Sequence, residues 1–118
     1  MNNELLIEIT TREDGWQVMR VTGDLCLYTA YEFRHDLHQA SRENSMVVVD
    51  LRGLDFFDST GLGVLFAANK RAHGVGGQIR VVGGKVVSRS LGNTRLATAL
   101  VFYDTVEQAI NDRPDTSS

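Results

Sequence analysis

The fold is decided by residues 46–72, which read MVVVDLRGLDFFDSTGLGVLFAANKRA. The apolar run at 46–51 is continuous and rich in β-branched residues, which is typical of a strand covered on both faces. From Leu62 onward apolar residues recur with helical spacing, and His73 followed by Gly74 ends that pattern. We expect residues 52–57 to form a loop between the two elements. A buried strand followed by a helix predicts an α/β domain.

Two further strands and a helix are predicted before this unit. Residues 5–9 form a short β-type run, and residues 16–21 alternate apolar and polar side chains, which is the period of a half-buried strand. The turn signal Asp14-Gly15 separates the two runs, so they predict an antiparallel hairpin, or at least neighbouring strands. Thr29, with Glu32 three residues later, matches a capping box and predicts an amphipathic helix that ends near residues 43–44.

After residue 74 the chain predicts two more strands, each followed by a helix. The strands are expected at 78–82 and 100–103, with helices that begin near Val86 and at the capping residue Thr105. The order β-β-α-β-α-β-α-β-α predicts a mixed sheet of four or five strands, with an antiparallel opening pair and then parallel crossovers, and helices packed on the sheet. We expect a single domain over 1–112 and a disordered polar tail at 113–118.

Composition excludes several classes of function. The 118 residues carry 12 Lys and Arg against 15 Asp and Glu, a net charge of −3, so no broad basic field is available for nucleic acid. No apolar run approaches the roughly 20 residues of a membrane span, and the first residues lack a secretory signal. Cys26 is the only cysteine, which excludes an internal disulfide and a cysteine-based zinc site. We expect a cytoplasmic protein without nucleic-acid or membrane partners.

Enzymatic constellations are missing from the sequence. His35 and His38 fall outside the apolar stripe of their predicted helix and are expected on its solvated face. GGK at 83–85 lacks the other positions of a phosphate-binding loop, and GVGG at 74–77 lacks the spacing of a dinucleotide fingerprint. The neighbours of Cys26 supply no electropositive setting, so a small packed or half-exposed side chain is favoured. We therefore expect no catalytic residue, no metal and no cofactor.

The segment DSTGLG at 58–63 is the most informative for function. It opens a helix, where unpaired backbone N–H groups and the helix dipole favour negative charge. Ser59 can simply cap the helix. Gly61 and Gly63, however, each cost about 1 kcal/mol relative to Ala in a helix, and a cap does not require them. Their missing side chains leave the backbone open to close approach by another molecule.

The residues before Ser59 strengthen the hypothesis of a docking surface. Phe56 and Phe57 stand beside the carboxylates of Asp55 and Asp58, although one phenylalanine can belong to the core. A phosphoserine carries about −1.5 to −2 charge at neutral pH, which a helix N-terminus tolerates. Phosphorylation of Ser59 is therefore expected to switch binding with little change in the fold.

DSTGLGVL at 58–65, after VVVDL at 47–51 and LDFF at 54–57, resembles the central motif of STAS domains, and more narrowly that of bacterial anti-sigma factor antagonists. The resemblance runs from VTGDL at 21–25 to YDTVEQA at 103–109. It implies a STAS-like fold and a non-enzymatic regulator of transcription, acting in stress response by partner switching. The unphosphorylated antagonist binds an anti-sigma factor that is also a serine kinase, and this binding frees a sigma factor.

The resemblance also implies the residues of the site. Ser59 is the implied phosphoacceptor: phosphorylation breaks the complex, and a serine phosphatase restores the binding form. The implied partner-binding residues are Asp24, Asp58, Thr60, Gly61, Leu62 and Gly63. When free, the protein is expected to be a monomer or a weak dimer.

Two positions depart from the family pattern, and other functions stay open. Cys26 stands where the family usually has an acidic residue, and TRL at 94–96 replaces a common Thr-Gly-Leu turn. The first alternative is a STAS-domain scaffold or a subunit of another signalling or lipid-transport complex. The second is an enzyme or nucleotide-binding protein, which measured turnover, or tight nucleotide binding that needs Lys85, would support.

Overall fold

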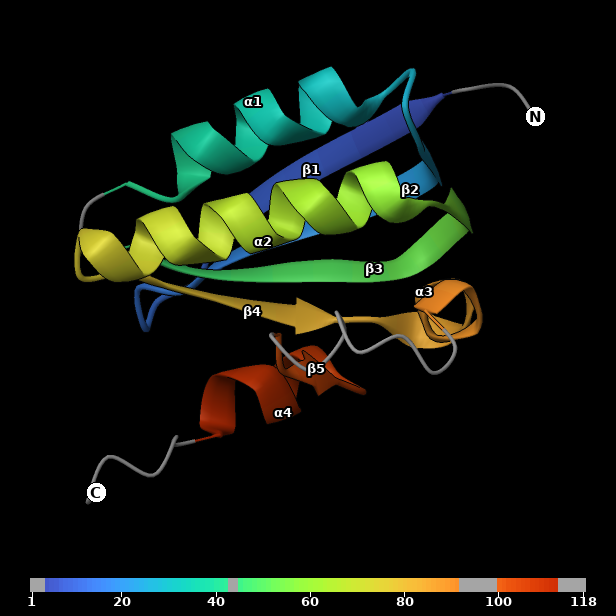
Figure 1. The fold of residues 1–118 in the computed structure, drawn as a ribbon. Coiled ribbons are helices and arrows are strands. Elements are labelled where there is room, and N and C mark those ends of the chain that lie inside the picture. The colour runs from blue at the N-terminus through green and yellow to red at the C-terminus, as the bar shows by residue number, and fades with distance from the viewer. Residues whose placement is uncertain (1–3, 43–44, 92–99, 113–118) are drawn as a thin grey trace.

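The computed structural model describes residues 4–42, 45–91 and 100–112. These residues form a five-stranded sheet with four helices packed on it (Figure 1). The strands are β1 (Leu5–Thr11), β2 (Gln17–Leu25), β3 (Met46–Phe57), β4 (Gln78–Val82) and β5 (Phe102–Tyr103). The helices are α1 (Ala30–Ala40), α2 (Ser59–Gly74), α3 (Gly84–Leu91) and α4 (Val106–Asn111).

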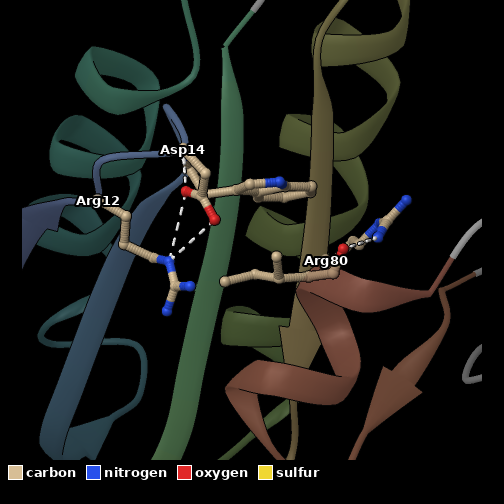
Figure 2. A network of polar contacts seen from close by, with 5 residues as sticks. Arg12, Asp14 and Arg80 are labelled. Carbon is tan, nitrogen blue, oxygen red and sulfur yellow. Dashed lines mark hydrogen bonds and ion pairs between the residues drawn. The ribbon is translucent and has the colours of Figure 1, made fainter.

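The sheet has the order β1-β2-β3-β4-β5 and is mixed, as predicted. β1 and β2 pair antiparallel, and every later pair is parallel. The turn between β1 and β2 uses the predicted residues. Gly15 has a φ of 90°, which glycine adopts at low cost, and the N–H of Trp16 donates to Asp14 Oδ1 at 3.1 Å. Figure 2 shows the Arg12 guanidinium facing the Asp14 carboxylate at this turn.

Apolar side chains fill both faces of the sheet. The larger cluster lies beneath α1 and α2 and includes Phe33, Leu37 and Ala40, which together with Ala30 form the buried stripe of α1. Val47 and Val49 of β3 belong to this cluster, whereas Val48 belongs to a smaller one with Trp16 and Val106. Because successive strand residues face opposite sides, the smaller cluster lies on the other face of the sheet, under α4. The continuous apolar run in β3 is thus covered on both faces, as expected.

The loop predicted at 52–57 is wrong, because β3 continues to Phe57. β3 remains paired with β2 along this segment, with register shifts beside Arg20 and Gly23. Each shift places an extra residue in β3, which bends the strand and interrupts the alternation of its side chains. Leu54 and Phe57 are buried by this arrangement. The prolonged strand carries the chain directly to the start of α2.

The capping box predicted from Thr29 is also wrong. The Thr29 side chain makes no capping hydrogen bond to α1. Its hydroxyl donates to the carbonyl oxygen of Asp24 at 2.6 Å and accepts from the N–H of Cys26 at 3.0 Å. Thr29 therefore fixes the connection between β2 and α1, which lies at the same end of the sheet as the start of α2 (Figure 1).

The remaining boundaries differ from the prediction by up to four residues, and β2 runs to Leu25 instead of residue 21. α1 ends at Ala40, before the predicted end near 43–44, and α2 begins at Ser59, three residues earlier than its apolar pattern. Thr105 caps α4 as predicted, accepting from the N–H of Gln108 at 3.1 Å. The predictions for 43–44, 92–96 and 113–118 lie outside the described residues. None of the helices in the described ranges combines the length and apolar character that crossing a membrane requires.

Candidate functional site

The first turn of α2 is organised by Asp58. Its Oδ1 accepts from the N–H of Thr60 at 2.9 Å, and its carbonyl oxygen accepts from the N–H of Gly61 at 3.1 Å. Asp58 has an extended backbone conformation, as an N-cap residue should. The interpretation that Ser59 serves as the cap is therefore wrong, since Asp58 performs that role.

Ser59 is the first residue of α2, and its side chain is exposed. Among the residues that the structure describes, no group forms a hydrogen bond with the Ser59 hydroxyl. The hydroxyl also stands at the positive end of the helix dipole. A phosphoryl group attached there can be solvated without disturbing the packed core.

The two glycines of the motif have different surroundings. Gly63 is exposed, and a Cβ atom at this position would meet nothing within 4 Å. Gly61 is buried, and its Cβ would lie 2.8 Å from Leu25 Cγ and 3.0 Å from Phe57 Cε1. The prediction that both glycines bare the backbone to a visiting molecule is thus wrong for Gly61, which instead allows α2 to pack closely on the strand ends. The surface at Gly63 is open.

Three of the other expected site residues differ in exposure. Thr60 is half-buried beside Ser59, whereas Leu62 is buried at 4% exposure and belongs to the core. Asp24, which follows the strand predicted at 16–21, lies near the end of β2 and is buried at 7% exposure. It pairs with Phe56 of β3, two residues before Asp58. The structure therefore gathers Asp58, Thr60 and Gly63 around Ser59, whereas Leu62 packs in the core beneath α2 and Asp24 is buried at the end of β2.

Exposed apolar side chains near this end of the sheet were missed in the sequence. Leu27, Tyr28 and Tyr31 are 69%, 78% and 69% exposed. The segment that carries them is tied to the start of α2, because the N–H of Asp58 donates to the carbonyl oxygen of Leu25 at 3.2 Å. The sequence did contain a signal for this exposure, because these three residues are apolar yet do not belong to the buried stripe of α1. Large exposed apolar side chains in a cluster are typical of an interaction surface.

The other sequence features behave as structural elements. His35 and His38 are exposed on α1, and Cys26 is buried. Gly84 opens α3 with a φ of 79°, so the GGK segment forms the turn from β4 into a helix. Within residues 4–42, 45–91 and 100–112, no group of three or more His, Cys, Asp or Glu side chains could hold a metal ion.

Comparison with known proteins agrees with this geometry. Residues 7–109 match the family model described as the STAS domain. A protein from Paenibacillus polymyxa named anti-sigma F factor antagonist is 29% identical over 101 residues, covering 83% of this chain and 86% of that protein. A crystal structure of an anti-sigma factor antagonist from Mycobacterium paratuberculosis superposes with a TM-score of 0.77 at 21% identity, covering 93% and 94% of the two chains. The Bacillus cell fate determinant SpoIIAA in its phosphorylated form superposes with a TM-score of 0.63 at 18% identity, covering 89% and 96%.

Proposed function

The chain belongs to the STAS domain family, and we propose that it is an anti-sigma factor antagonist switched by phosphorylation of Ser59. The unphosphorylated form binds an anti-sigma factor that is also a serine kinase, and this frees a sigma factor. The observation that carries the proposal is the exposed Ser59 hydroxyl, which has no hydrogen-bond partner among the described residues, at the start of α2. The name of the Paenibacillus relative supports the choice among the functions of STAS domains.

The proposed docking surface combines exposed backbone at a glycine with exposed apolar side chains. Gly63 presents no side chain, so a partner can approach the first turns of α2. Leu27, Tyr28 and Tyr31 provide apolar area in the neighbouring segment, and aromatic side chains contribute strongly to protein interfaces. Gly61 and Leu62 are buried and contribute indirectly, because their packing on the core holds α2 in position.

Phosphorylation changes this surface by charge. The γ-phosphoryl group of ATP passes to Ser59 Oγ, the hydroxyl loses its proton, and ADP leaves. The resulting dianion stands beside Asp58 and near the exposed Asp55. A partner packed over Gly63 must then desolvate these negative charges, which is costly. The helix dipole offsets part of the added charge within the protein, so the complex dissociates while the fold persists.

The protein itself supplies no catalysis in this cycle. The kinase activity belongs to the anti-sigma factor, and a separate serine phosphatase hydrolyses phospho-Ser59 to restore the binding form. The site resides in one cytoplasmic STAS domain over 1–112, and no metal or cofactor takes part. The free protein is a monomer or a weak dimer.

The test is a parallel capture of partners by the parent chain, Ser59→Glu and Thr11→Glu. Thr11 is exposed at the other end of the sheet, so Thr11→Glu adds the same charge away from the site. We expect an anti-sigma factor kinase to be recovered with the parent chain and Thr11→Glu, but not with Ser59→Glu. Incubation with that kinase and ATP should add one phosphate to the parent chain and none to Ser59→Ala.

Two results would contradict the proposal. Equal recovery of the kinase by Ser59→Glu and the parent chain would show that charge at this position does not control binding. Recovery of signalling-scaffold or lipid-transport components in place of a kinase would favour the alternative STAS-domain function.

A further inference from the structure

We propose that the protein also has a binding site for a small phosphate-type oxyanion, at the end of the molecule away from Ser59. An open pocket of about 360 Å³ lies where α1 and α2 end, lined by His38, Gln39, Ser41, Arg42, Arg71 and Val75. These helix ends lie together at one end of the sheet, and α2 begins at the opposite end (Figure 1). Arg71 comes twelve residues after Ser59 in the same helix, a rise of about 18 Å. The site is independent of the proposed function.

The Arg71 side chain is held in place by a buried hydroxyl. Arg71 Nη2 donates to Ser41 Oγ at 3.4 Å, and Ser41 is only 4% exposed. The Ser41 hydroxyl in turn donates to the carbonyl oxygen of Leu37 at 2.5 Å. A guanidinium has five N–H donors, and this arrangement uses one of them. The others form no hydrogen bond with the described residues, so they can serve a ligand in the pocket.

The second guanidinium, that of Arg42, is also oriented by an uncharged acceptor. Arg42 Nη2 donates to Gln39 Oε1 at 3.1 Å. Within the described ranges, neither Arg42 nor Arg71 forms an ion pair, whereas Arg12 and Arg52 pair with Asp14 and Asp50. The pocket lining contains no carboxylate among the described residues. Two positive charges therefore line one pocket, and no carboxylate of the described residues pairs with them.

Helix dipoles explain only part of this arrangement. Basic side chains in the last turn of a helix interact favourably with its C-terminal carbonyl groups, which accounts for His38 on α1 and Arg71 on α2. The dipole effect does not explain why His38 and Arg71, from two different helices, line the same pocket. It also does not explain the presence there of Arg42, which lies just beyond the end of α1. Guanidinium groups bind phosphate oxygens in a bidentate geometry. The volume falls within the usual range for small-molecule pockets, so it can hold a phosphate ion or a small phosphate monoester.

The test is an NMR titration of the ¹⁵N-labelled full chain at constant ionic strength, with inorganic phosphate, phenyl phosphate or chloride. We expect both phosphates to produce saturable shifts at the amides of Ser41, Arg42 and Arg71, and chloride to produce none. Tighter binding of phenyl phosphate than of inorganic phosphate would identify a phosphate monoester as the preferred ligand. Equal or weaker binding of phenyl phosphate would identify free phosphate. The amides around Ser59 should not move.

Matched variants identify the charges responsible. Arg71→Gln should weaken phosphate binding by about tenfold, the size expected for a lost charge-assisted hydrogen bond, and Arg42→Gln should weaken it several-fold. Arg89→Gln, an exposed site on α3, should bind as the parent chain does. Shifts that do not saturate, or that chloride reproduces, would overturn the site. Unchanged binding by Arg42→Gln would also overturn the site. Because Arg42 is exposed, this variant still tests the proposal if Arg71→Gln fails to fold.

Discussion

Gly61 lies directly against Leu25: a Cβ atom on Gly61 would lie 2.8 Å from Leu25 Cγ. Leu25 is fully buried at the end of β2, and Phe57, at the end of β3, lies almost as close. The absence of a side chain at residue 61 therefore sets how closely the first turn of α2 approaches the sheet. Ser59 stands two residues earlier in the same turn, so this packing also determines where its hydroxyl is presented.

Gly61→Ala should destabilise the fold, whereas Gly63→Ala should not. The added methyl group at 61 must displace Leu25 or Phe57 in a packed core, and overpacking of this kind costs about 1–3 kcal/mol. At 63 the methyl group enters open space and should raise stability by up to about 1 kcal/mol, through helix propensity. Urea denaturation of the two variants beside the parent chain measures this difference. Equal midpoints would show that the Gly61 contact is relieved without cost.

Gly63→Leu should block the partner without unfolding the protein. Its larger side chain extends over the surface that the anti-sigma factor is proposed to cover, and affinity should fall at least tenfold. Gly74→Leu is the matched control, because Gly74 also has open space around it but stands at the last residue of α2. A binding titration with circular dichroism on the same samples distinguishes docking from folding. Equal weakening by both variants would exclude a local effect at Gly63.

Asp58 and Ser59 should respond differently to substitution. Asp58→Ala removes the acceptor for the Thr60 N–H and should lower the free energy of unfolding by about 1 kcal/mol, the usual cost of a lost N-cap. Asp58→Asn keeps an acceptor and should recover most of this loss. Ser59→Glu adds a charge at an exposed helix start and should change stability by less than about 1 kcal/mol. A large loss in Ser59→Glu would mean that phosphorylation unfolds the switch instead of altering its surface.

The order of elements could be predicted because hydrophobic periodicity is a local property of the sequence. The stripe of α1 and the β-branched run of β3 each identify a strand or helix without reference to the rest of the fold. The extension of β3 to Phe57 could not be predicted this way. It depends on pairing with β2 through two irregular registers, which interrupt the alternation that marks a regular strand.

The residues of the candidate site likewise divide into those that could be predicted from the sequence and those that could not. Ser59 could be located because the chain pattern places it at a helix start after a buried strand. The burial of Gly61 and Asp24 could not be predicted, since it results from contacts with residues distant in sequence, Leu25 and Phe56 among them. The role of Thr29 was mistaken for the same reason. The Thr29 hydroxyl could bond either to the first turn of α1 or within the β2–α1 connection, and in the structure it bonds within the connection.

Arg80 should prove essential for the attachment of α4. This buried side chain donates from Nη1 to the carbonyl oxygens of Ala109 and of Asp112, the latter at 2.7 Å, and from Nη2 to Gln78 Oε1 at 2.9 Å. Its Cζ lies 5.0 Å from the centroid of the Trp16 ring, on the sheet face that Figure 2 shows around Arg80. Arg80→Met removes the side-chain donor to the carbonyl oxygens of Ala109 and Asp112 and should cost about 2–3 kcal/mol.

Two measurements check this role of Arg80. Amide exchange in α4 should accelerate in Arg80→Met, and the Trp16 fluorescence should change as the cation leaves the ring. Arg89→Met, at an exposed position of α3, should leave both signals unchanged. Slow exchange in α4 despite the loss of Arg80 would show that apolar contacts alone hold the helix.

The pair formed by Asp50 and Arg52 should make stability depend on pH in the acid range. Burial of Asp50 raises the pKa of its carboxyl group, but the hydrogen bonds from the Arg52 side chain and N–H together outweigh it, and the pKa lies below 3.8. A carboxyl group whose pKa is lowered in the folded state stabilises that state above its unfolded pKa. This contribution is lost as the pH falls through the folded pKa.

Arg52→Gln should therefore be less stable than the parent chain at pH 7, by about 1–2 kcal/mol, since the guanidinium is partly exposed and solvent weakens the pair. The difference should shrink as the pH falls from about 5 to below the folded pKa of Asp50, because protonation removes the charge that Arg52 stabilises. Arg20 acts on Asp50 only through space, so Arg20→Gln should show the same pH dependence with a smaller amplitude. Denaturation curves at several pH values measure both differences. A difference that stays constant across the acid range would mean that Arg52 stabilises the fold by packing and not through the charge of Asp50.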